Sequence, residues 1–279
     1  MYREVASLLR REYLRWIRAP MSVISGLMMP VLLLILFGQG FDLGKAIPSN
    51  QVSAILLGAP NFFSYFAVGM VAFAGVSAAS FAGIGVISDK QLGIQQRICS
   101  TPASRAAIFT ASLVFRGLLT LIPAFLVIGL ALLFAYVPGL TGLSVPSGVQ
   151  LLGVGEFLIA VLMLSLAFSA LFLAFGFSMS HTESYVGVTT ILQLPVLLAS
   201  NVMYPSGLMP SWLQYAVSVN PISLAVNVMR ASLFGRTSYV YSPEVYLLGL
   251  FGWTAALIGI AALLTVRSFR SRVVSPSRA

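Results

Sequence analysis

Residues 151–179, LLGVGEFLIAVLMLSLAFSALFLAFGFSM, form an apolar stretch whose single charged side chain is Glu156. A helix needs about 20 apolar residues to cross the hydrocarbon core of a bilayer, so this stretch is long enough to span one. It lacks the alternating pattern of a barrel strand, which predicts a helix. Similar apolar stretches occupy most of the remaining chain, at 20–37, 62–87, 106–137, 185–201 and 245–266.

The composition also indicates a polytopic membrane protein. Of the 279 residues, 58% are hydrophobic and 8% are charged, whereas soluble proteins average about 45–50% apolar and 25% charged residues. We therefore predict an all-α membrane protein with six transmembrane helices, organised as a single transmembrane domain over residues 1–279. No segment is expected to hold a soluble ATPase or enzyme domain.

The basic residues predict the orientation of this domain. Twelve of the 16 lysines and arginines lie before the first stretch, between the second and third, or after the last. These three regions share one side of a six-span protein, and cytoplasmic segments are enriched in Lys and Arg. Both termini are therefore predicted to be cytoplasmic. The same clustering argues against nucleic-acid binding, despite a formal net charge of +9.

The N-terminal residues 1–19 are predicted to form an amphipathic helix in the membrane surface. One side carries apolar residues, including Trp16, and the other carries Arg3, Arg10, Arg11, Arg15 and Arg18. Apolar residues facing lipid and arginines facing phosphates are typical of an interfacial helix. Two roles stay open: this helix anchors the chain to membrane lipids, or it docks a partner.

Two further segments differ from simple loops. Residues 88–105, SDKQLGIQQRICSTPASR, form the longest internal cytoplasmic segment, and we expect a short helix around 91–98. Residues 202–243 are external by topology but strongly apolar, and prolines divide them into pieces too short to cross. Non-helical backbone at membrane depth is tolerated only against protein or a water-filled cavity, so we predict re-entrant helices there.

Features inside the predicted spans suggest close packing and two candidate polar groups. Gly75, Ala79 and Gly83 form a ridge of small residues that predicts helix–helix contact, and Pro123 predicts a kink. Glu156 is predicted either to line a substrate path or to pair with Arg230, because an ionisable group in a membrane is costly. Arg116 either acts in transport or extends toward the cytoplasmic interface.

The sequence offers few residues for catalysis or metal binding. It contains no GxxxxGK[ST] phosphate loop. His181 is the only histidine, so neither a His-based metal site nor a Ser-His-Asp triad can be built. Cys99 is the only cysteine and allows no internal disulfide. We therefore expect no catalytic residue, no metal site and no enzyme activity in this chain by itself.

Several motifs, taken together, resemble one family of membrane proteins. They are RAP at 18–20, DKQLG at 89–93, STPASR at 100–105, YPSGLMPSWLQ at 204–214, and Asn220-Pro221 followed by Arg230. The chain resembles, over nearly its whole length, the permease subunits of type-2 ABC exporters, in the daunorubicin-resistance and nodulation-factor group with the type V exporter fold. It departs from that pattern at Lys90 and Gln91, where relatives often carry acidic residues.

The resemblance implies an ATP-driven exporter in the inner or plasma membrane of a prokaryote. Its cargo would be a hydrophobic or amphipathic drug, lipid or glycolipid. The assembly would contain a second permease, identical or homologous, and two copies of an ABC ATPase subunit. ATP and Mg²⁺ would bind to the ATPase subunits, and this chain would bind no cofactor.

The resemblance also assigns residues to two regions. Residues 1–19 and 88–105 would couple the chain to the ATPase, through Arg10, Arg11, Arg15, Asp89, Gln91, Gly93, Arg97, Thr101 and Pro102. Residues 202–243 and the fourth span would provide the substrate path or external gate, through Glu156, Pro205, Gly207, Pro210, Trp212, Asn220 and Arg230.

Two alternatives stay open. Within the same class, the cargo is a polysaccharide or a lipid-linked glycan, whose sugars would stack on aromatic side chains. From another class, the chain is an ion-coupled transporter or a membrane-embedded enzyme. The sequence has no histidine cluster and no paired acids within its spans, which counts against both members of the second class.

Overall fold

The computed structural model describes residues 21–40, 55–94, 105–146, 150–235 and 241–273. Within these ranges the chain is helical and contains no strand, which confirms the all-α prediction. Two short 3-10 helices, Phe134–Tyr136 and Ser206–Leu208, accompany the α-helices. The α-helices are α2 Met21–Gly40, α5 Phe62–Ser80, α6 Ala82–Gln91, α8 Arg105–Leu119, α9 Leu121–Leu133, α10 Leu151–Ser178, α11 Thr182–Leu198, α12 Ser211–Val219, α13 Pro221–Phe234 and α14 Pro243–Val273.

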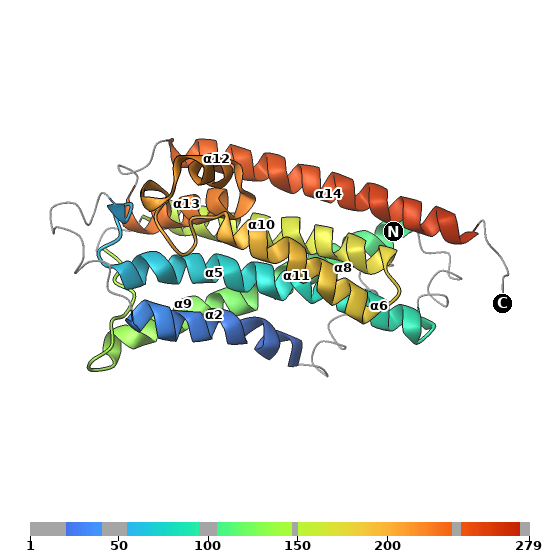
Figure 1. Cartoon of the computed structure of the whole chain (residues 1–279), viewed down its shortest axis with the longest axis horizontal. Helices are drawn as coiled ribbons and strands as arrows, with labels where there is room; N and C mark the ends of the chain where they lie inside the picture. The colour runs from blue at the N-terminus through green and yellow to red at the C-terminus, as the bar shows by residue number, and fades with distance from the viewer. Residues whose placement is uncertain (1–20, 41–54, 95–104, 147–149, 236–240, 274–279) are drawn as a thin grey trace.

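The long helices lie side by side in an elongated bundle (Figure 1). At one end lie α6, the turn between α10 and α11, and the C-terminal part of α14. At the other end lie α12, α13 and the N-terminal end of α5. This arrangement agrees with the predicted alternation of cytoplasmic and external ends, so we refer to the first end as cytoplasmic and the second as external.

Several helices are long and apolar enough to cross a membrane. Four qualify among the described residues: Phe62–Gln91, Ile108–Tyr136, Leu151–Ser178 and Pro243–Arg267. The pair α12 and α13, bent by 80°, would make a fifth if counted as one span. At 17 residues, α11 is about 26 Å long, slightly shorter than a typical hydrocarbon core. The chain is thus a multi-pass membrane protein, and the six-span count and re-entrant helices stay predictions.

Two of the spans are interrupted. The break between α5 and α6 falls at Phe81, and the break between α8 and α9 falls at Thr120. Pro123 follows the second break by three residues and has no N–H to donate to the carbonyl of Leu119 in the preceding turn. The kink that the sequence predicts at Pro123 stays a prediction, since Ile108–Tyr136 forms a single candidate span of 29 residues.

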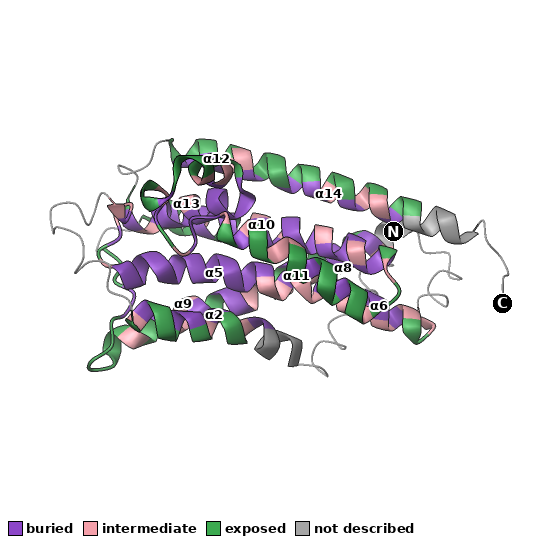
Figure 2. Cartoon of the chain, in the orientation of Figure 1, coloured by how far each residue is buried: buried purple, intermediate pink, exposed green. Residues whose placement is uncertain are grey.

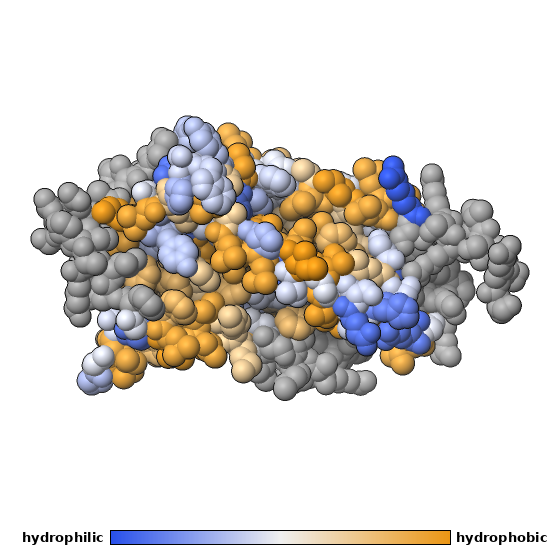
Figure 3. Space-filling view, viewed as in Figure 1, coloured by the Kyte–Doolittle hydropathy of each residue, from blue (hydrophilic) through white to orange (hydrophobic). Residues whose placement is uncertain are grey.

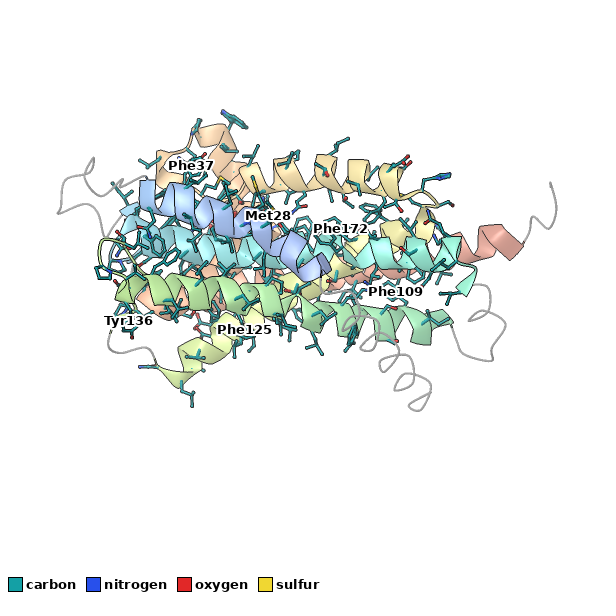
Figure 4. All side chains as sticks on the ribbon, turned by 90° about the horizontal axis from the view of Figure 1, so that it is seen from below. Met28, Phe37, Phe109, Phe125, Tyr136 and Phe172 are labelled. Carbon is teal, nitrogen blue, oxygen red and sulfur yellow. The ribbon has the colours of Figure 1, made fainter. Side chains whose placement is uncertain are left out.

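Buried residues run along α5 and α10, whereas the outer helices carry many exposed residues (Figure 2). The exposed side chains of the outer helices include large apolar ones. Phe172 on α10 is fully buried between helices, whereas Met28 on α2 and Phe125 on α9 are 68% and 48% exposed (Figure 4). Apolar surface covers the middle of the bundle, and hydrophilic residues gather over the cytoplasmic end of α6 and the start of α11 (Figure 3). This distribution suits a bundle surrounded by lipid.

The ridge of small residues on the second span does pack against other helices. A Cβ added at Gly83 would lie 2.6 Å from the carbonyl oxygen of Phe172, and one added at Gly176 would lie 2.6 Å from the Cα of Gly83. A Cβ added at Gly75 would lie 3.4 Å from the hydroxyl of Ser165. The predicted helix–helix contact is confirmed, and at Gly83 the backbones of α6 and α10 approach too closely for a larger side chain.

Candidate functional site

The external end is organised around α13, whose start follows from its sequence. Asn220 is the N-cap, and its side-chain oxygen accepts a hydrogen bond from the N–H of Ile222. Pro221 occupies the first turn, where its missing N–H leaves no bond unmade. The Asn220 side-chain amide also donates to the carbonyls of Val196 and Ala199, at the C-terminal end of α11. One side chain therefore caps two helices at the same point.

Arg230 on α13 is fully buried and lies at the centre of this end. Its Nε and Nη2 atoms donate to the carbonyl of Tyr65, at 3.2 and 2.9 Å. Nη1 donates to the carbonyl of Asn201 at 2.8 Å, and Nη2 also donates to that of Val202 at 3.1 Å. These carbonyl dipoles stabilise a buried positive charge, and they connect α13 to α5 and to the segment after α11.

Tyr65 also contacts Arg230 through its side chain. Its ring lies 3.4 Å from the guanidinium carbon of Arg230, and its hydroxyl donates to the carbonyl of Asn201 at 2.9 Å. The side-chain amide of Asn201 donates to Asn227, and its backbone N–H donates to the hydroxyl of Ser223. The Arg230 centre, defined here as Tyr65, Asn201, Val202 and Arg230, joins three chain segments through polar contacts.

The Arg230 centre also depends on a glycine. A Cβ added at Gly69, one turn after Tyr65 on α5, would overlap the carbonyl of Val202 and would lie 3.1 Å from Nη2 of Arg230. A larger residue at this position would displace the segment after α11. Arg230 and Asn220 stand out in the sequence, whereas Tyr65, Gly69 and Asn201 do not, because nothing in their local pattern indicates these long-range contacts.

Glu156 lies on α10 and is buried, with 9% of its surface exposed. One turn earlier, a Cβ added at Gly153 would lie 2.7 Å from the carbonyl of Ser232, so α10 and α13 are in close contact at this level. Glu156 therefore lies near the external end of the bundle, at the depth that the sequence predicted. Its pairing with an arginine, or its position on a substrate path, stays a prediction.

The other predicted gate residues are divided between core and surface. Pro205 is buried, whereas Gly207 and Pro210 are exposed. On α12, Trp212 is 71% exposed and Tyr215 is 78% exposed. Exposed aromatic side chains on a short external helix are typical of the membrane–water boundary. The structure thus brings Asn220 and Arg230 into one packed region and leaves Trp212 on the outside.

Three of the predicted coupling residues, Asp89, Gln91 and Gly93, lie at the opposite end of the bundle. Asp89 and Gln91 belong to α6, so the second span extends as a helix three residues beyond Ser88, the first residue of the expected loop. Gly93 follows with a φ of +67°, a conformation that favours glycine. The remaining coupling residues lie outside the described residues: Arg10, Arg11, Arg15, Arg97, Thr101 and Pro102.

Arg116 is half-buried and packs between helices. A Cβ added at Gly85 on α6 would lie 3.1 Å from the guanidinium carbon of Arg116 on α8, so the guanidinium rests against α6.

Among the described residues, no group of three or more His, Cys, Asp or Glu side chains could hold a metal ion.

Comparison with known proteins places this helical bundle in a family. The family of ABC-2 type transporters matches residues 3–234. The chain belongs to this family.

Named relatives agree with this assignment. The ycf38 protein of Cyanophora paradoxa, whose name describes a transport permease, is 27% identical over 89% of this chain and 80% of its own length. The daunorubicin resistance ABC transporter permease protein DrrB1 of Streptomyces coeruleorubidus is 24% identical over 91% and 81%. DrrC of Mycobacterium tuberculosis, named for doxorubicin resistance, is 20% identical over 89% and 82%.

Proposed function

We propose that this chain is the transmembrane permease subunit of an ATP-driven ABC exporter. The cargo is a hydrophobic or amphipathic compound of the drug, lipid or glycolipid class, moved out of the cytoplasm. The observation that carries the proposal is the ABC-2 family match over residues 3–234, joined by relatives named as drug-resistance ABC transporter permeases. The lipid-facing helices and the buried polar centre at one end support it.

The proposed assembly contains a second permease and two ABC ATPase subunits. ATP and Mg²⁺ bind to the ATPase subunits, and this chain supplies the membrane path without a cofactor of its own. The face of α11 that carries Val186, Ile191, Leu194 and Leu198 is exposed and apolar. Such a face needs lipid or another membrane chain against it, which suits a permease dimer in a bilayer.

The two ends of the bundle then have separate roles. Residues 88–105, with the N-terminal helix 1–19, receive the movement of the ATPase subunits in the cytoplasm of a prokaryotic cell. Residues 202–243 form the external gate, in which the Arg230 centre holds α13 against α5. Glu156, buried on α10 near that end, is the candidate residue for sensing cargo charge.

The test begins with purification of the tagged chain from native membranes and identification of the ABC ATPase that accompanies it. The reconstituted pair should hydrolyse ATP and export daunorubicin, a fluorescent amphipathic probe, in a vanadate-sensitive manner. The chain alone should show no hydrolysis, because its sequence has no phosphate loop. The matched control is the same pair with the phosphate-loop lysine of the ABC ATPase replaced. Robust hydrolysis by the chain itself, free of contaminating ATPase, would contradict the proposal.

A further inference from the structure

The break between α5 and α6 is closed by a side chain from another helix. Tyr185 on α11 is fully buried, and its hydroxyl donates to the carbonyl of Ser80 at 2.5 Å. The same hydroxyl accepts a hydrogen bond from the N–H of Gly83 at 3.2 Å. A helix that breaks at Phe81 leaves backbone groups near the break without intrahelical partners. One tyrosine hydroxyl supplies partners on both sides of it.

Glycines allow Tyr185 to approach this closely. A Cβ added at Gly83 would overlap the Tyr185 ring and would also lie 2.6 Å from the carbonyl of Phe172. A Cβ added at Gly176 would lie 2.6 Å from the Cα of Gly83. At this level the backbones of α6 and α10 therefore lie close together, and the Tyr185 side chain of α11 packs against them.

The other end of α6 is attached to α10 by Lys90. Its ammonium group donates to the carbonyls of Gly176, Phe177 and Met179 at 2.7, 2.6 and 2.6 Å. These carbonyls belong to the C-terminal end of α10, where the last four carbonyls have no intrahelical partner and the helix dipole favours a cation. Lys90 is thus a cap supplied by a neighbouring helix.

We propose that Tyr185 and Lys90 are positioning residues that join α6 to α10 and α11, so that these three helices move as one unit when the ATPase moves residues 88–105. We call the four residues Gly83, Lys90, Gly176 and Tyr185 the α6 joint. Without it, the break at Phe81 would let α6 tilt alone and absorb the movement. With it, a displacement of α6 also displaces α11. The C-terminal end of α11 is capped by Asn220, in the external region. This inference rests on the proposed function.

A first test measures the distance between the end of α6 and the start of α11 in the purified chain, without the ATPase or any cargo. In a Cys99→Ser background, spin labels are placed through Leu92→Cys and Glu183→Cys, both at exposed positions beyond α6 and at the start of α11. The distance distribution between the labels should be narrow, and it should broaden in Tyr185→Phe and in Lys90→Met. Lys90→Arg should keep it narrow. An unchanged distribution in both Tyr185→Phe and Lys90→Met would overturn the proposal.

A second test measures transport in the full complex. Tyr185→Phe keeps the ring and removes only the hydroxyl, so ATP hydrolysis should continue while daunorubicin moved per ATP falls about tenfold, within the range of allosteric couplings. Tyr136→Phe, on the exposed 3-10 helix Phe134–Tyr136 and outside the proposed gate, is the matched control and should leave the ratio unchanged. A normal ratio in Tyr185→Phe would overturn the role of the joint in transport. If the unaltered complex does not transport daunorubicin, the proposed function is contradicted. The spin-label distances then test separately whether Tyr185 and Lys90 hold α6 against α10 and α11.

Discussion

Replacement of Arg230 by methionine should destabilise the external end of the bundle. The change keeps the apolar stem but removes four hydrogen bonds to the carbonyls of Tyr65, Asn201 and Val202 and the contact with the Tyr65 ring. Bonds from a charged donor contribute about 1.5–3 kcal/mol each, and relief of the buried charge returns several kcal/mol. The net loss should be about 2–4 kcal/mol, which corresponds to a fall in Tm of about 3–7 °C for a chain of this size.

The measurement is thermal unfolding of the purified chain in detergent, followed by the loss of the monodisperse peak in size-exclusion chromatography. Arg267→Met, an exposed arginine on α14, is the matched control and should shift Tm by less than the assay error. Arg230→Lys tests the geometry, since lysine keeps the charge but has no planar fork to reach three carbonyls. It should also lower Tm. An Arg230→Met variant as stable as the unaltered chain would refute the reasoning about this centre.

Three further predictions follow from the two ends of the bundle. Gly93→Pro should uncouple ATP hydrolysis from transport, because proline cannot adopt the φ of +67° at this turn. A normal amount of daunorubicin transported per ATP would show that the coupling contact lies elsewhere. Ser211→Cys should react rapidly with an impermeant thiol reagent from outside and Val226→Cys slowly, since Ser211 is exposed and Val226 is buried; labelling of Ser211→Cys from the cytoplasm only would contradict the topology. If the Glu156 carboxylate faces the cargo, Glu156→Gln should weaken export of cationic daunorubicin and spare a neutral dye, measured by flux assays on both probes. Equal loss of export for both probes, with a lower Tm, would indicate that Glu156 has a packing role.

Apolar stretches predicted the helices because the thickness of a bilayer fixes the length of a spanning helix. The second apolar stretch ends at Ile87, whereas α6 continues to Gln91, inside the segment predicted to be cytoplasmic. Aspartate, lysine and glutamine mark the exit from the apolar region, but they do not stop a helix, and Lys90 and Gln91 have favourable helix propensity. A change in polarity is therefore a poor indicator of a helix end.

The candidate site was predictable only where a residue stands out in its own segment. Arg230 is a charge in an apolar run, and Asn220 precedes a proline, so both were identified. Tyr65 and Tyr185 were not, because their partners lie 165 and 102 residues away along the chain. Lys90 was noted only as a departure from the family pattern, and its role as a cap for α10 depends on how α6 and α10 pack.

The most direct test of the exporter function is transport into inside-out proteoliposomes that contain the chain and its ABC ATPase. The account predicts that daunorubicin accumulates inside the vesicles only when ATP and both subunits are present, and that vanadate stops it. The corresponding control uses the ATPase with its phosphate-loop lysine replaced, and it should show no accumulation. Accumulation by the chain alone, driven by an imposed ion gradient and indifferent to ATP, would contradict the account and identify an ion-coupled transporter.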